Sequence, residues 1–196
     1  MLGHKQSELL RKNFEPMSRI THIVVSPMKR TLQTARIAFE PLLLDGLTFV
    51  AWPQLREWGY VPCSIGDKLK VLKEFINHNP VDLSDVQEGW EAGQKLRKED
   101  RYKDSRPSDV RIQLWKLGCK ALEEKEDMVK EKPSLAKFHS LKRFGRRESD
   151  AIRQDVEILV VSHADFLGYL VRDPNSPAES KKHPYFLFLH LITGNL

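Results

Sequence analysis

The sequence predicts one α/β domain, folded as three layers with helices on both faces of a mostly parallel sheet. Two short β-branched runs, at 21–25 and 156–161, each stop at a serine and pass directly into a helical pattern. Helical patterns also separate the other candidate strands, and this alternation is typical of parallel sheets. A chain of 196 residues with 40% hydrophobic content can bury one such core. We therefore expect a single domain over 1–196, with a charged, helical insertion at about 67–150.

Composition argues against several classes of protein. No apolar run reaches the roughly 20 residues that cross a bilayer, and the first residues lack the apolar segment of a secretory signal. Cys63 and Cys119 are far apart and lack metal-ligand spacing, so we expect neither a disulfide framework nor a metal site. These features favour a cytoplasmic or nuclear protein without membrane contact. The net charge of +5 suits an anionic ligand.

The first predicted helix, 5–14, is followed by a short strand and a second helix. Apolar residues share one side of the first helix, as in an amphipathic segment: Leu9, Leu10 and Phe14. The run 22–25 is typical of a buried strand, and Ser26–Pro27 predict an N-cap followed by proline in the first helical turn. The second helix should pack on the sheet through residues three or four apart: Met28, Leu32, Ala35 and Phe39.

A strand is predicted at 48–51, before a turn-rich loop at 53–66. The next helix should be capped by Asp67 and should use three apolar residues: Leu69, Leu72 and Ile76. The stretch 88–104 is charged and loses the apolar pattern. We expect it to be a mobile excursion outside the core.

A long helix is predicted between Pro107 and Pro133, where it should cover the sheet or the mouth of a pocket. Its apolar side consists of Val110, Leu114, Leu117 and Ala121. Charged residues form its outer face: Lys116, Lys120, Glu124 and Lys125. The run 156–161 is apolar at nearly every position, which indicates a central strand buried on both faces. A helix should start at Ala164, and 185–192 should form the last strand.

The two strand-to-helix junctions should meet at one edge of the sheet, because parallel strands that lead into helices end on the same side. Helix N-termini at this edge attract anions. Arg30 lies in the first turn of its helix, and its planar guanidinium can bind two phosphate oxygens. His163 lies at the end of its strand, where an imidazole can donate to the same anion or attack it.

Four segments follow the pattern of one known family. SPMKRTLQTA, at 26–35, follows Ser-Pro-x-x-Arg-Thr-x-Gln-Thr-Ala, and VVSHADFLGYL, at 160–170, follows a second-histidine segment. LGHKQSELL opens the chain like a Leu-Thr-x-x-Gly-x-x-Gln helix start, and LREWG, at 55–59, falls where an acid is expected. In order and separation these segments resemble the histidine phosphatase superfamily, with its phosphoglycerate mutase-like fold. The resemblance covers 2–57 and 156–170 well.

The resemblance implies a two-step phosphoryl transfer from a small phosphorylated substrate, without cofactor or metal. In the family, a histidine from an Arg-His-Gly motif at the end of the first strand attacks phosphorus. By position, Arg30 would bind the phosphate, His163 would stabilise the charge of the transition state and Glu57 would protonate the leaving oxygen. The enzyme class would be a phosphoric monoester hydrolase or a mutase. The insertion should determine the specificity.

The Arg-His-Gly motif does not occur in this sequence, and His4 falls in the helix that follows its expected position. We therefore expect an amino-terminally truncated member that lacks its first strand and is inactive as it stands. Because that strand is central in the family's sheet, its neighbours should be left with unpaired edges. Asp165 is a second departure, because a carboxylate there opposes phosphate unless it points away.

Each candidate residue also has a plain structural interpretation. Arg30 could be a solvated helix arginine, and His163 could be a hydrogen-bonded histidine at a strand end. Glu74 and Glu88 compete with Glu57 for the role of the acid. The other histidines, apart from His4, show no ligand spacing: His22, His78, His139, His183 and His190.

Two other functions remain open. The chain could be a non-catalytic relative that binds phosphate. It could also be a basic module for nucleic acid, through a cluster of Lys142, Arg143, Arg146 and Arg147. That cluster lacks interleaved aromatic residues and any known motif, so nucleic acid is not expected as a partner.

Overall fold

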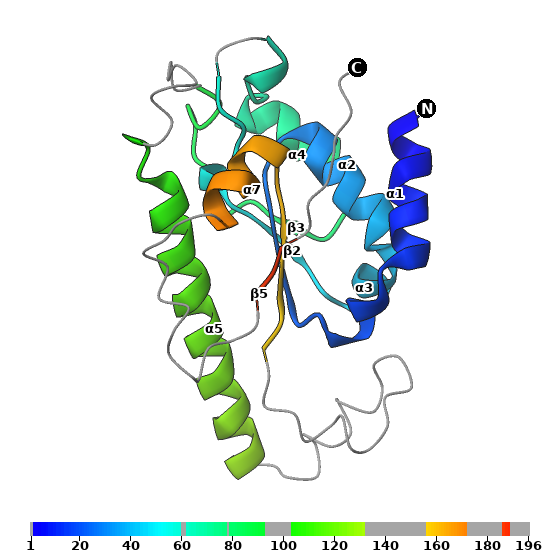
Figure 1. Ribbon diagram of the computed structural model, residues 1–196, viewed down its shortest axis with the longest axis vertical. Coiled ribbons are helices and arrows are strands. Elements are labelled where there is room, and N and C mark those ends of the chain that lie inside the picture. Colours follow the sequence, from blue (N-terminus) through cyan, green and yellow to red (C-terminus); the bar gives the residue numbers. More distant parts are fainter. Residues whose placement is uncertain are drawn as a thin grey trace.

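A five-stranded parallel sheet forms the middle layer of the computed structural model, which describes residues 2–59, 62–77, 79–92, 103–131, 156–171 and 186–188. The strands lie in the order β3-β2-β1-β4-β5, with helices on both faces (Figure 1). The strands are β1 (His22–Val25), β2 (Phe49–Ala51), β3 (Val81–Asp82), β4 (Ile158–Val161) and β5 (Phe186–Phe188). The prediction of a three-layer α/β/α fold with a parallel sheet is confirmed.

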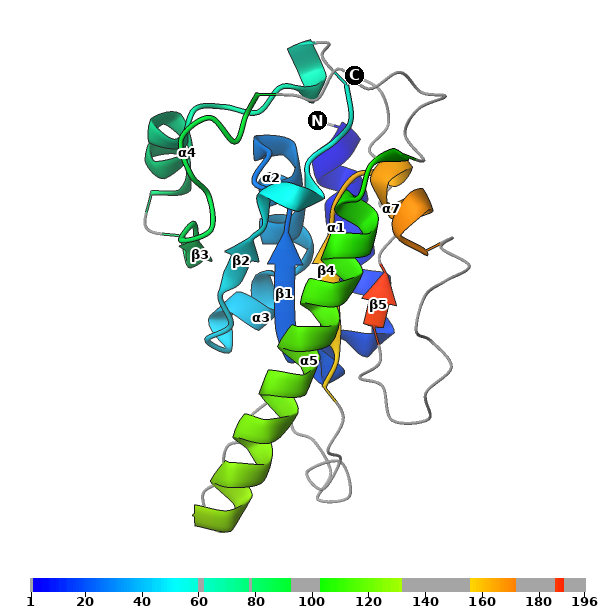
Figure 2. The same ribbon diagram turned by 90° about the vertical axis from the view of Figure 1, so that its left-hand side faces the viewer.

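Each face of the sheet has its own helices. One side carries α1 (Leu2–Asn13), α2 (Lys29–Ala38), α3 (Glu40–Leu44) and α4 (Leu69–Ile76). The other carries α5 (Arg106–Glu131) and α7 (Ala164–Val171). Short 3-10 turns complete the described elements: η1 (Glu15–Arg19), η2 (Pro53–Leu55) and η3 (Pro62–Ser64). The long helix α5 starts near the edge where the strands end and runs across the sheet beyond its opposite edge (Figure 2).

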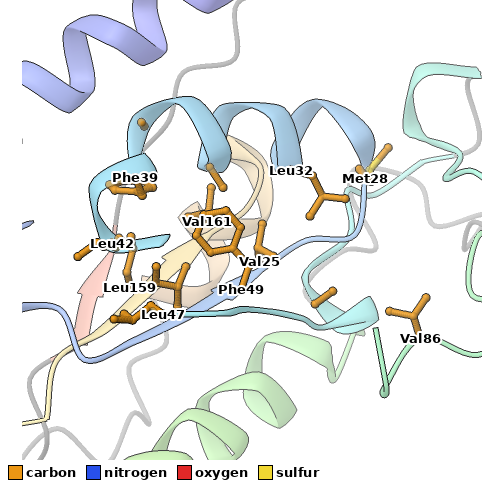
Figure 3. Close-up of a cluster of buried hydrophobic side chains, with 14 of the residues drawn as sticks. Val25, Met28, Leu32, Phe39, Leu42, Leu47, Phe49, Val86, Leu159 and Val161 are labelled. Atoms are coloured by element: carbon orange, nitrogen blue, oxygen red, sulfur yellow. The ribbon is translucent and has the colours of Figure 1, made fainter. Parts of the chain in front are cut away.

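Alternating strand residues divide the core into two clusters, as the two-residue period of a strand requires. In β1, Val25 packs in the cluster with α2, whereas Val24 packs in the cluster with α5. Figure 3 shows Leu32 of α2, and Phe39 directly after this helix, over Val25 and Val161. All four residues of β4 are buried, which confirms a central strand covered on both faces.

The predicted apolar faces of the helices are largely correct. All four predicted residues of the second helix are buried: Met28, Leu32, Ala35 and Phe39. In α5, Val110, Leu114 and Ala121 are buried and Leu117 is half-buried, so this helix covers the sheet as expected. In α1, Leu10 and Phe14 pack against the core, but Leu9 is 59% exposed. The prediction for Leu9 is wrong because the helix turns that side toward solvent.

The predicted starts of three helices are wrong by a few residues. Helix α2 begins at Lys29 after an extended Met28, so Ser26 is not its cap. Helix α4 begins at Leu69 without a side-chain cap. Asp67 instead forms an ion pair with Lys29, at 3.1 Å. Helix α5 begins at Arg106, before Pro107, because proline is well tolerated in a first turn.

Two further expectations need correction. Trp90 belongs to the stretch expected to lie outside the core, but it is only 6% exposed and packs in the α2 cluster. The strands β1 and β4 each pair on both sides, so neither carries the unpaired edge expected next to a missing strand. The predictions for 189–192, Lys125, His78, His139, His183 and His190 and the basic cluster at 142–147 fall on positions or side chains that the structure does not describe.

Gly66→Ala should lower the free energy of unfolding by about 1–3 kcal/mol, because a new Cβ would collide with the indole of buried Trp90. Urea unfolding measures this change. Gly168→Ala is the matched control, since the added methyl meets no atom within 4 Å. It should stabilise α7 by up to about 1 kcal/mol through helix propensity. Equal effects of the two substitutions would contradict the packing argument.

Candidate functional site

The register of the sheet brings the predicted junctions together. Val25 of β1 pairs with Val161 of β4 on one side and with Ala51 of β2 on the other. The backbone N–H of Ser26 donates to the carbonyl of Val161 at 2.9 Å, which continues the pairing by one residue. His163 and the loop after β2 therefore lie at the same edge as the start of α2. Ser26, Arg30, Glu57 and His163 around this edge are called the cradle below.

His163 is fully buried in the cradle and both ring nitrogens have partners. Its Nδ1 lies 3.0 Å from Nη2 of Arg30. Its Nε2 lies 2.9 Å from Oγ of Ser26, and Oγ1 of Thr31 is at 3.5 Å. Because a guanidinium can only donate, Nδ1 must accept the hydrogen bond from Arg30. The ring proton is therefore on Nε2, which donates to Ser26.

His163 is neutral around pH 7. Burial, and after it the positive charges of Arg30 and Arg106, lower its pKa from 6.5 to about 3. The resting imidazole thus supplies one N–H and one lone pair rather than a positive charge. Arg30, not His163, carries the positive charge of the pair.

Arg30 is held in place at both ends of its guanidinium. One nitrogen donates to His163, and the other donates to the backbone carbonyl of Cys63, which lies in η3. Burial lowers the pKa of Arg30, while the negative charge of Glu57 acts in the opposite direction. An arginine remains protonated under these conditions. The interpretation of Arg30 as a freely solvated helix residue is therefore wrong.

Glu57 follows η2 in the loop after β2, and its carboxylate points at the histidine. Its Oε2 lies 3.8 Å from Nδ1 of His163, and its Oε1 accepts a hydrogen bond from the backbone N–H of Trp58 at 2.9 Å. The loop is tied to β4, since Oγ of Ser162 donates to the carbonyl of Leu55 at 2.7 Å. The competing acids Glu74 and Glu88 are exposed on other elements.

Asp104 and Arg106 are two charged residues near the cradle that were not predicted from the sequence. Arg106 is only 7% exposed, and its Nε donates to Oδ2 of Asp104 at 2.7 Å. Its Nη2 has no hydrogen-bond partner within the described part of the chain. Burial acts to raise the pKa of Asp104, but hydrogen bonds from Arg106 and Trp58 and the charge of Arg106 outweigh it, and the pKa is lowered. Asp104 ends the charged stretch 88–104 and Arg106 begins α5, and no local signal distinguishes either from a solvated charge.

Three residues considered on sequence lie elsewhere. Asp165 is exposed on the first turn of α7. His22 is at the opposite end of β1 from the cradle, where its Nδ1 contacts Oγ1 of Thr21 at 2.9 Å. His4 lines a mainly apolar cavity of about 150 Å³ between α2, α4 and the strands β2 and β3, together with residues such as Phe49. That cavity does not include the cradle.

Residues 1–96 match the family model of the histidine phosphatase superfamily (branch 1). This part of the chain belongs to the histidine phosphatase superfamily. The matched segment includes Arg30 and Glu57 and ends before α5, β4 and His163. Curated proteins and solved structures provide no match to the chain. His163 therefore joins the histidine phosphatase segment through the contacts described above rather than through the family match.

The described residues of this histidine phosphatase relative contain no group of three His, Cys, Asp or Glu side chains placed to hold a metal ion. Cys63 and Cys119 are free thiols. Within the same described residues, no helix has both the length and the apolar character needed to span a bilayer. The cradle itself presents one guanidinium, one neutral imidazole, one carboxylate and one hydroxyl.

Proposed function

We propose that the cradle binds the phosphate group of a small phosphorylated molecule, and that this chain does so without turning it over. The observation that carries the proposal is the 3.0 Å contact between Arg30 and His163 at the carboxyl edge of the sheet, with Glu57 beside it. This edge is where α/β proteins commonly bind ligands. In the superfamily the corresponding chemistry is hydrolysis or transfer of a phosphomonoester, and a cytoplasmic setting fits such substrates.

The three side chains would have different roles toward a phosphate. Arg30 would donate charge-assisted hydrogen bonds to its oxygens. His163 would respond to the bound anion, because a nearby negative charge favours the protonated ring and raises its pKa. Glu57 is the carboxyl group within reach that could pass a proton to a leaving oxygen.

The second part of the proposal, absence of turnover, rests on the histidines. Hydrolysis through a phosphohistidine needs a nucleophilic nitrogen in line with the leaving oxygen. In the described part of the chain, His4 and His22 are both away from the cradle, and both nitrogens of His163 have partners. We therefore propose a binding role for the cradle in this chain.

The purified 196-residue chain should not hydrolyse p-nitrophenyl phosphate, whereas inorganic phosphate should bind and raise its melting temperature. Absorbance at the p-nitrophenolate band and thermal unfolding measure the two quantities. Chloride at equal ionic strength is the control for a general salt effect. Turnover that disappears in His163→Ala would contradict the non-catalytic part, and an unchanged melting temperature would contradict phosphate binding.

A further inference from the structure

We infer that the Asp104–Arg106 ion pair at the start of α5 is a positioning device for Glu57. The pair contacts both residues that flank Glu57 in the chain. Nη1 of Arg106 donates to the carbonyl of Arg56 at 3.0 Å. Nε1 of Trp58 donates to Oδ2 of Asp104 at 2.5 Å. The backbone before Glu57 and the indole after it are thereby held at the start of α5.

The pair is itself held firmly. Nε of Arg106 donates to Oδ2 of Asp104 at 2.7 Å, and the backbone N–H of Arg106 donates to Oδ1 at 3.0 Å. The side chains of the pair are 9% and 3% exposed. A buried pair with this many hydrogen bonds has one geometry, because losing any partner would leave a charge unsatisfied in the interior. It can therefore fix the position of a neighbouring loop.

Arg106 also connects the loop to the helix that follows His163. Its guanidinium carbon lies 5.3 Å from the ring centre of Trp58 and 5.4 Å from that of Phe166 in α7. Trp58 and Phe166 are themselves 5.2 Å apart. The backbone N–H of Trp58 donates to Oε1 of Glu57. Holding Trp58 in place therefore also holds the carboxylate in its direction. The path runs from α5 through Trp58 to Glu57 and ends beside His163.

The role assigned to Arg106 differs from that of a second phosphate-binding arginine. In the proposed function Glu57 lies beside the bound phosphate, and the inference depends on that function only in this respect. Arg106 acts on the loop that carries Glu57, and its Nε forms an ion pair with Asp104. A lysine cannot replace it, because an ammonium lacks the planar fork that reaches Asp104 and Arg56 together.

Hydrogen exchange of the Trp58 amide tests the positioning directly and needs no ligand. In Arg106→Met this amide should exchange about tenfold faster or more, because the loop opens locally, while the Val24 amide in β1 keeps its rate. Arg106→Lys should resemble Arg106→Met. Asp104→Asn, which keeps the shape of the side chain, provides the same test if Arg106→Met does not fold. An unchanged Trp58 rate in a folded variant would overturn the inference.

Arg111→Met is the matched control. Arg111 lies on the same helix and also donates to a backbone carbonyl, that of Leu170 in α7, at 3.1 Å. Its other terminal nitrogen donates to Oγ of Ser108 on the same helix, at 2.8 Å. The Trp58 amide should exchange at the original rate in this variant. Acceleration equal to that of Arg106→Met would show a general loosening of α5 and would overturn the inference.

The coupling between Arg106 and Glu57 gives a second readout, one that a merely structural role would not change. Calorimetry measures the dissociation constant for inorganic phosphate. The fold-change that Arg106→Met causes in this constant should differ by about fivefold between the original protein and the Glu57→Gln variant. Equal fold-changes would mean independent residues and would overturn the inference. If the original protein does not bind phosphate, the proposed function fails, but the exchange rates still decide the positioning role.

Discussion

Lowering the pH from about 7.5 to about 5 should reduce the free energy of unfolding by about 2 kcal/mol through His163 alone. The pKa of this residue is about 3 in the folded protein, against an ordinary value of 6.5, because burial and then the charges of Arg30 and Arg106 oppose protonation. Below pH 6.5 the unfolded chain takes up the proton and the folded protein does not. As far as His163 is concerned, the free energy of unfolding is therefore at its full value above pH 6.5 and decreases progressively as the pH falls toward 3.

Urea unfolding at the two pH values measures this loss. Carboxyl groups also titrate near pH 5, so the loss of unfolding free energy between the two pH values has to be compared in the original protein and in His163→Gln. Glutamine keeps a donor for Ser26 and an acceptor for Arg30 but cannot titrate. The free energy of unfolding of His163→Gln should therefore fall by about 2 kcal/mol less over this pH range than that of the original protein. His4→Gln, on the exposed side of α1, is the matched control. Identical pH dependence in His163→Gln and the original protein would contradict a buried neutral imidazole.

Arg30→Met should weaken the binding of inorganic phosphate by about 10- to 100-fold, the usual effect of losing charge-assisted hydrogen bonds. Methionine keeps much of the apolar stem but removes the charge and the hydrogen bond to Nδ1 of His163. Isothermal titration calorimetry at neutral pH measures the affinity. The phosphate affinity of Arg30→Lys should lie between those of the original protein and Arg30→Met, because an ammonium keeps the charge but lacks the planar fork.

Arg36→Met is the matched control for this prediction. Arg36 lies on the same helix as Arg30, is exposed, and donates to Oδ1 of Asn79 at 3.4 Å. The Arg36→Met substitution removes a positive charge from the same helix as Arg30→Met, but at a distance from the cradle. Its phosphate affinity should remain close to that of the original protein. If Arg36→Met and Arg30→Met weaken binding equally, the effect is one of net charge and the cradle is not the phosphate site.

Much of the fold follows from short stretches of sequence, because the patterns involved are local. The apolar run of β4 and the three-and-four spacing in α2 predicted their burial correctly. The meeting of the junctions followed from one rule about parallel strands. Errors arose where a side chain found a distant partner. Ser26 was expected to cap α2, but its hydroxyl pairs with His163, which is 137 positions away in the chain.

The stretch 88–104, which contains Trp90 and Asp104 and leads into Arg106, shows the same limit more strongly. Its charges and lack of period resemble those of a solvated excursion, yet Trp90 lies in the core. Asp104 and Arg106 are buried because α5 packs on the face of the sheet next to α7. Only that packing turns an ordinary Asp-x-Arg sequence into neighbours of Glu57.

The sequence by itself determined the strands β1, β2 and β4, the apolar sides of α2 and α5, and the two junctions that carry Arg30 and His163. These are consequences of local periodicity and chain direction. The tertiary structure alone decided that His163 is buried and neutral, with its proton on Nε2, and that a pair from α5 holds the loop of Glu57. Protonation and side-chain direction depend on neighbours that are brought together only when the sheet and its helices have packed.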